Sequence, residues 1–97
     1  MASDGDNDLP VEPAERVRAI LEHIVDALEV DGDVEVDENA ERIVGRVNGE
    51  DVGLLIGRRG QTIDAVQLLC YRAAFRGVQE RKRVVVDAAG YRERRQA

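Results

Sequence analysis

The chain has 97 residues and a mass of 10.7 kDa, which is enough for one compact domain and too little for two of ordinary size. Apolar residues make up 43% and charged residues 35%, which excludes global disorder, and the single cysteine and single histidine exclude an intrachain disulfide and a structural zinc site. The net charge of −6 argues against a polyanionic partner only when it is taken alone, because it is the sum of two halves of opposite sign.

An acidic segment opens the chain. Residues 1–11 are rich in aspartate and have little apolar content, so we expect a disordered acidic tail there. Pro13 fits the first turn of a helix, and apolar residues then recur at helical spacing, which predicts a helix over residues 13–29. Its apolar face is made of Val17, Ile20, Leu21, Ile24 and Leu28. His23 lies off this face and is expected to be a solvated surface residue.

Two strands are predicted next, because apolar and charged residues alternate. The first covers residues 34–37, with its two valines on one face. In the second, Ile43, Gly45 and Val47 share a face, and the run ends at the turn signal Asn48-Gly49. The two strands together predict a hairpin.

Helical spacing returns in the second half of the chain. Residues 52–56 predict one or two helical turns, and residues 61–77 predict a longer helix with Cys70 on its apolar face. The three valines at residues 84–86 predict a strand that is buried on both faces. An arginine-rich exit, residues 89–97, follows this strand.

The order helix, strand, strand, helix, helix, strand predicts an α+β fold. A helical crossover from the second strand to the third allows these two strands to run parallel. We therefore expect a three-stranded mixed sheet with three helices on one face, in a single domain over residues 12–88.

The loop of residues 57–60, Gly-Arg-Arg-Gly, carries the clearest chemistry. Glycine permits a close approach of a ligand to the main chain, the two arginines supply positive charge, and the helix that begins at Gln61 offers its N–H groups to a phosphate. The loop lies in the basic half: residues 52–97 contain ten bases and four acids, whereas residues 1–51 contain 16 acids and four bases. This asymmetry predicts a polyanionic partner or, alternatively, a basic face that is merely solvated.

Other phosphate-binding motifs do not fit the loop. A P-loop needs a lysine after its last glycine, and a dinucleotide-binding fingerprint needs a third glycine, which this segment lacks. A plain helix-helix turn with exposed arginines remains an alternative on these four residues alone.

The wider context favours nucleic acid. The string I-G-x-x-G-x-x-I between two helices, in this order of elements, resembles the type II K-homology (KH) domain, whose G-x-x-G loop clamps about four nucleotides of a single strand. Residues 48–51, 54–67 and 86–95 are similar to the KH domain of the bacterial Jag family, also called SpoIIIJ-associated or KhpB proteins.

The resemblance also implies a second nucleic-acid domain with an Arg-x-x-x-His signature, which this sequence lacks. We therefore expect a truncated or shortened chain, with residues 89–97 as a linker toward the missing domain. The resemblance to that family further implies that this protein is an RNA-binding regulator that acts with a small KH partner.

The leading hypothesis is a non-enzymatic domain that binds single-stranded RNA, with single-stranded DNA as an alternative partner. The residues expected to bind are Ile56, Gly57, Arg58, Arg59, Gly60, Gln61, Ile63, Val66 and Val85. The second hypothesis is a protein-interaction module that forms a homodimer, or a heterodimer with a small KH protein.

No catalytic arrangement, cofactor or metal site is expected from the residue types present. The longest apolar runs are far shorter than the roughly 20 residues of a membrane span, and the acidic start does not resemble a signal peptide. We expect a cytoplasmic protein that does not bind membranes.

Overall fold

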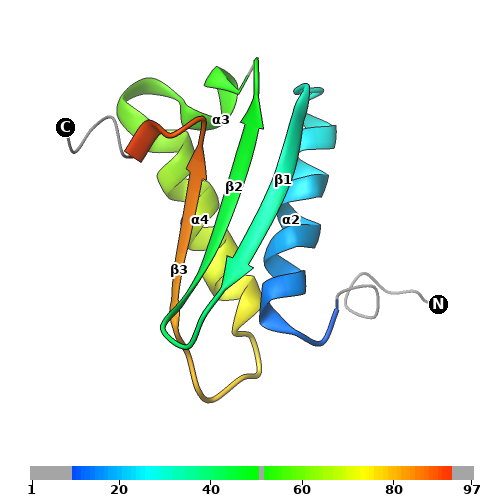
Figure 1. Ribbon diagram of the computed structural model, residues 1–97, viewed down its shortest axis with the longest axis vertical. Coiled ribbons are helices and arrows are strands. Elements are labelled where there is room, and N and C mark those ends of the chain that lie inside the picture. Colours follow the sequence, from blue (N-terminus) through cyan, green and yellow to red (C-terminus); the bar gives the residue numbers. More distant parts are fainter. Residues whose placement is uncertain (1–9, 51, 93–97) are drawn as a thin grey trace.

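The computed structural model describes residues 10–50 and 52–92. In this part of the chain the elements follow the predicted order of one helix, two strands, two helices and one strand (Figure 1). Residues 1–9 of the predicted tail and residues 93–97 of the predicted exit lie outside the described residues. None of the described helices has the length and apolar character needed to cross a membrane.

Three strands form one mixed sheet, in the spatial order β1 (Gly32–Glu38), β2 (Arg42–Gly49) and β3 (Arg83–Ala88). The first two strands are antiparallel and the last two are parallel. The chain turns between β1 and β2 at Asn39, whose side-chain oxygen accepts hydrogen bonds from two backbone N–H groups, those of Glu41 and Arg42.

The helices α2 (Pro13–Ala27) and α4 (Gln61–Ala74) lie across one face of this sheet (Figure 1). The four-residue helix α3 (Gly53–Ile56) packs against α4 and β3. Among the described residues no helix lies on the other face of the sheet (Figure 1). The predicted α+β fold, a three-stranded mixed sheet with three helices on one face, is confirmed.

The core lies between the sheet and the helices, and alternation along the strands places it there. In β2, Ile43 and Val47 are fully buried on the same face as Gly45, as predicted. The side chains without exposed surface are Val17, Leu21, Ile43, Val47, Ile63, Cys70, Ala74, Val86 and Ala88. Burial raises the pKa of the Cys70 thiol to about 12, so this core residue is protonated at neutral pH.

Both long helices end earlier than predicted. The helix expected to reach residue 29 ends at Ala27, because Glu29 adopts a left-handed backbone with φ 56°. The helix expected to reach residue 77 ends at Ala74, where Phe75 departs from helical geometry and turns into the core, leaving 2% of its surface exposed.

Two strand predictions also need correction. Asn48 and Gly49 do not form a turn; they remain in β2 and pair with Asp33 and Gly32 of β1. A β-carbon at position 49 would collide with the backbone of the neighbouring strand, so the glycine serves a close approach of strands. The strand at residues 84–86 is not buried on both faces, because Val85 is only half-buried on the uncovered face.

Gly45 brings α2 close to the centre of the sheet. A β-carbon added there would lie 2.6 Å from Cδ1 of Leu21 and 3.2 Å from Cγ1 of Val17, both on α2. These two side chains are fully buried in the densely packed core, so an added methyl group would force them to shift against their neighbours. The distance between helix and sheet therefore depends on this glycine.

Replacing Gly45 with alanine is expected to lower the free energy of unfolding by about 1–3 kcal/mol, because the added methyl group overpacks the core. Gly53→Ala is the matched control, since nothing lies within 4 Å of the β-carbon that it adds, and its effect should stay within about 0.5 kcal/mol. Urea unfolding followed by circular dichroism measures both variants. Equal free energies of unfolding for the Gly45→Ala and Gly53→Ala variants would contradict the close approach of α2 to Gly45.

Candidate nucleic-acid interface

The loop of residues 57–60 reverses the chain between α3 and α4 through positive backbone angles. The φ angles are 72° at Gly57, 56° at Arg59 and 79° at Gly60. The Gly57 N–H closes α3 by donating to the Gly53 carbonyl oxygen at 3.0 Å. A left-handed arginine is unusual, and such strained residues cluster at binding sites. The side chains of Arg58 and Arg59 are exposed.

Both loop glycines also serve the protein's own packing. A β-carbon at Gly57 would collide with Oγ1 of Thr62, and one at Gly60 would lie 2.7 Å from the hydroxyl oxygen of Tyr91. Tyr91 comes from the turn after β3, and its ring covers Gly60, which is buried. The main chain at Gly60 is therefore covered by the protein itself and is not accessible to a ligand from that side.

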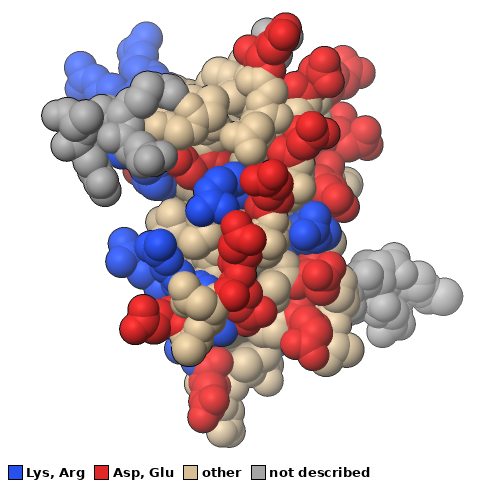
Figure 2. Space-filling view, viewed as in Figure 1, with Lys and Arg blue, Asp and Glu red and all other residues tan. Residues whose placement is uncertain are grey.

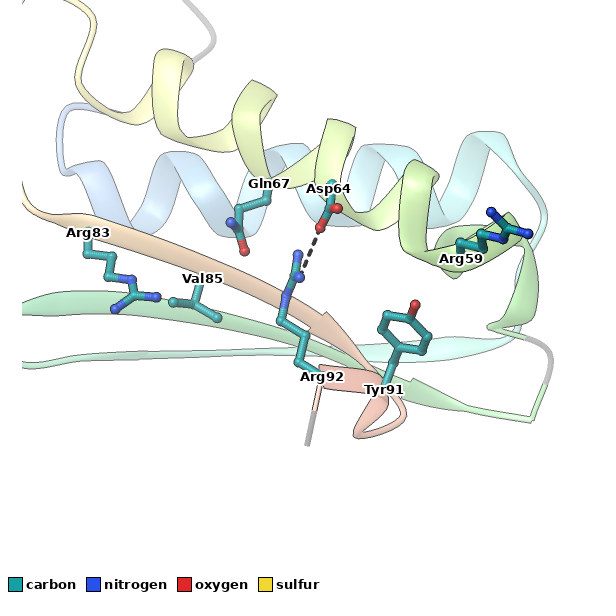
Figure 3. A pocket seen from close by; sticks show the side chains of 7 residues that line it. All are labelled: Arg59, Asp64, Gln67, Arg83, Val85, Tyr91 and Arg92. Carbon is teal, nitrogen blue, oxygen red and sulfur yellow. Dashed lines mark ion pairs between the residues drawn. The ribbon is translucent and has the colours of Figure 1, made fainter. Parts of the chain in front are cut away.

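A groove lies beside this loop, between α4 and β3 (Figure 3). Its lining residues are Arg59, Asp64, Gln67, Arg83, Val85, Tyr91 and Arg92. Arg59 stands at the loop end of the groove and Arg83 at the opposite end (Figure 3). Most of these side chains are polar or charged, so the groove suits a polar ligand better than an apolar one.

Side chains of α4 and of the turn after β3 satisfy the outer edge of β3. The N–H of Val86 donates to Oε1 of Gln67 at 2.9 Å, and Nε of Arg92 donates to the Val86 carbonyl oxygen at 2.7 Å. Nη1 of Arg92 also forms an ion pair with Oδ1 of Asp64 at 2.9 Å, so Arg92 connects β3 to α4 (Figure 3). Its Nη2 is buried and has no hydrogen-bond partner among the described residues.

The structure brings only some of the predicted binding residues to the groove. Arg59 and Val85 line it, at the loop and on β3 respectively. Arg58 is exposed in the loop and Gln61 is exposed directly after it, whereas Ile56 is half-buried against the core.

Two predicted residues lie on the inner side of α4. Ile63 is fully buried and Val66 is 8% exposed, and both belong to the core cluster. They support α4 from inside the domain and present no open surface to a ligand.

Sequence reasoning did not select five residues that line the groove. These residues are Asp64, Gln67, Arg83, Tyr91 and Arg92. The spacing of Asp64 and Gln67 places them one helical turn apart on α4, and Arg83 shares a strand face with Val85. These patterns show which side chains are neighbours, but not that the two elements face each other.

Charge is divided across the molecule. The exposed positions 33, 35 and 37 of β1 are all acidic, and Figure 2 shows acidic side chains gathered over β1 and α2, on the right of the view. Basic side chains lie mainly on the left, over β3 and the loop of residues 57–60 (Figure 2). The groove therefore lies on the basic side of the domain, which favours an anionic ligand.

The contact of Tyr91 with Gly60 predicts a coupled effect on stability. Gly60→Ala should lower the free energy of unfolding by about 1–3 kcal/mol, because alanine is strained at this φ and its methyl group meets the Tyr91 ring. The same change in a Tyr91→Ala background should cost less, since only the backbone strain remains. Urea unfolding of the four proteins in this cycle measures the coupling. Additive effects would show that the ring does not cover the glycine.

Two relatives and one family model match this chain. The family model described as KhpA/KhpB, KH domain, matches residues 14–87. The RNA-binding protein KhpB of Bacillus subtilis (strain 168) is 35% identical over 85 residues, which cover 88% of this chain and 41% of the relative. The RNA-binding protein KhpB of Clostridium symbiosum is 39% identical over 77 residues, which cover 77% of this chain and 35% of the relative.

The chain thus spans less than half the length of these two relatives. The matched range contains the loop of residues 57–60 and all of the described helices except Pro13, the first residue of α2. Fold, loop and sequence agree, and the chain belongs to the KhpA/KhpB KH-domain family.

Proposed function

We propose that this domain binds single-stranded RNA, with the sugar-phosphate backbone at the loop of residues 57–60 and the bases in the groove between α4 and β3. Both relatives are named RNA-binding proteins, which supports RNA as the ligand. The observation that carries the proposal is the position of Arg58 and Arg59. These arginines are exposed at one end of the groove and have no ion pair among the described residues.

The phosphates are held from two directions. Arg58 and Arg59 supply full positive charges, and α4 points its N-terminus at the loop, with no side chain capping it at Gly60. The N–H groups of a first helical turn, together with the helix dipole, favour an anion there. Because Tyr91 covers Gly60, the phosphates contact the outer side of the loop, where the arginines stand.

The bases meet a mixed surface in the groove. Val85 and the ring of Tyr91 provide apolar and aromatic contact, and stacking on an aromatic ring is tolerant of base identity. Gln67 and Arg83 provide hydrogen-bonding groups along the same groove. The groove thus combines sequence-tolerant stacking with a small number of polar contacts.

This proposal concerns the domain described by residues 10–50 and 52–92. It assigns no catalytic step: the buried Cys70 thiol is protonated, and the described residues contain no cluster of histidine, cysteine and carboxylate side chains that could hold a metal ion. A cytoplasmic location and binding of single-stranded DNA are further parts of the proposal.

Replacing both loop arginines with glutamine should weaken RNA binding without unfolding the domain, because both side chains are exposed. Each lost phosphate contact should change the slope of log K against log salt by about 0.7, so the slope should fall by about 1.4 and the affinity by about 25-fold at about 0.1 M salt. Fluorescence anisotropy of a labelled oligouridylate measures both quantities.

The control of equal charge is the double variant Arg18→Gln and Arg72→Gln, which replaces the half-buried Arg18 beside Glu15 on α2 and the exposed Arg72 on α4. Binding by this control should stay within about twofold of the original protein. Equal weakening by the two double variants would attribute the effect to net charge and would contradict a specific role of the loop.

A second candidate function is a protein-interaction module. Leu68 and Leu69 on the outer side of α4 are 49% and 52% exposed, and Leu54 on α3 is 66% exposed. A contiguous patch of exposed apolar side chains marks a contact with another protein, and these leucines are the candidates for such a patch on the helical side of the domain.

The change Leu69→Asp tests this second function. If the leucines form a homodimer, sedimentation velocity should show a dimer for the original protein and a monomer for the variant, with RNA affinity unchanged. A monomer for both proteins at high concentration would remove self-association as a function of these residues.

A further inference from the structure

The uncovered face of the sheet carries two arginines that stand side by side. Side chains alternate between the two faces of a strand, and in the parallel pairing of β2 with β3 the Cα of Arg42 is opposite that of Arg83. Both side chains are exposed. The next pair along this face is Val44 with Val85. Val44 is 9% exposed although no helix covers this face among the described residues, so neighbouring side chains shield it.

The other basic side chains around this face already have acidic partners. Arg46 pairs with Asp37 at 2.6 Å, and Lys82 pairs with Glu38 at 2.8 Å. Arg92 pairs with Asp64 across the groove. These pairs leave the neighbouring acids engaged with other bases.

Arg42 and Arg83 have no such partner. Neither side chain makes an ion pair or a hydrogen bond within residues 10–50 and 52–92. Like charges that are directly opposite on neighbouring strands destabilise a sheet. Two adjacent, unpaired arginines are therefore a site where a bound anion would remove a repulsion that the protein alone leaves in place.

This site is continuous with the groove described above. A shallow depression on the uncovered face is lined by Arg42, Val44, Arg46, Arg83, Val85, Asp87 and Arg92. Arg83, Val85 and Arg92 also line the groove between α4 and β3. One surface thus runs from the groove around the edge strand β3 onto the uncovered face, because Arg83 and its neighbours on the strand line both parts.

We propose that Arg42 and Arg83 form a second phosphate site, which holds the continuation of the same RNA strand after it leaves the groove. The inference rests on the proposed function, because it extends the RNA path beyond the loop of residues 57–60. Val44 and Val85 lie next to the arginines and offer apolar contact to a base whose phosphates the arginines hold.

The distribution of charge favours a polyanion as the ligand and indicates the path that an RNA strand takes over the surface. The unpaired arginines occur at both ends of β3: Arg58 and Arg59 at the loop, and Arg42 and Arg83 at the start of the strand. The acidic row of β1 repels a polyanion from the far side of the sheet. Asp87 lies further along the depression, and its Oδ1 accepts the backbone N–H of Arg92 at 3.0 Å. A strand that follows β3 meets the four arginines and avoids the acids.

Oligomers of two lengths distinguish binding at this second site from binding at the loop of residues 57–60. An oligouridylate of about four nucleotides fills the clamp at the loop, whereas one of about ten nucleotides also reaches Arg42 and Arg83. The double variant Arg42→Gln and Arg83→Gln should bind the short oligomer as the original protein does. It should bind the long oligomer about 25-fold more weakly at about 0.1 M salt, with the salt slope lowered by about 1.4.

Fluorescence anisotropy with the two labelled oligomers is the measurement, and circular dichroism checks that each variant is folded. The control Arg18→Gln with Arg72→Gln removes equal charge elsewhere and should not distinguish the oligomers. Loss of affinity for the long oligomer alone supports the second site.

Equal weakening of both oligomers, or no weakening of either, overturns the second site while leaving the proposed function intact. In those cases the variant Arg58→Gln with Arg59→Gln still weakens the short oligomer. If the original protein binds neither oligomer, the proposed function fails, and the second site fails with it.

Discussion

The hydrogen bonds of a single residue, Val86, hold the functional surface of this domain together. β3 is an edge strand, so the backbone groups that point away from β2 need partners outside the sheet. Gln67 of α4 and Arg92 after β3 supply them at 2.9 Å and 2.7 Å. Because Arg92 also pairs with Asp64, the helix and the strand are fixed at a set separation. These polar side chains bridge α4 and β3 at the floor of the groove, and the apolar core joins the two elements beneath it.

Much of the fold was predictable because its signals are local. Alternation identified β1 and β2, and the apolar stripe of α4 identified its inner face, including Cys70. The helix ends were less predictable, because α2 ends in a local left-handed turn at Glu29, whereas Phe75 leaves α4 to enter the core. Asn48-Gly49 is a strong turn signal in isolation, but here the pairing with β1 keeps both residues in the strand.

The candidate site was predictable at its loop and at Val85 of β3, but not at its other lining residues. The spacing of the glycines and arginines located residues 57–60, and the exposure of Arg58 and Arg59 agrees with a role in binding. Ile63 and Val66 belong to the same helical stripe as Cys70, so the spacing that predicted α4 already placed them in the core. The other wall of the groove comes from residues more than 20 positions away, such as Arg83 and Tyr91, and their approach to the loop is a tertiary contact.

The position of Tyr91 has a mechanical consequence. This residue lies three positions after the end of β3, and its ring rests on Gly60, in the loop that precedes α4. A force applied to the polypeptide after residue 92 would first load the contacts of Arg92 with Asp64 and Val86 and then the ring of Tyr91. Lifting the ring would expose the glycine and loosen the left-handed bend, while the sheet stayed paired. The shape of the loop is thus linked to the position of the Tyr91 ring, although the two lie about 30 residues apart in the sequence.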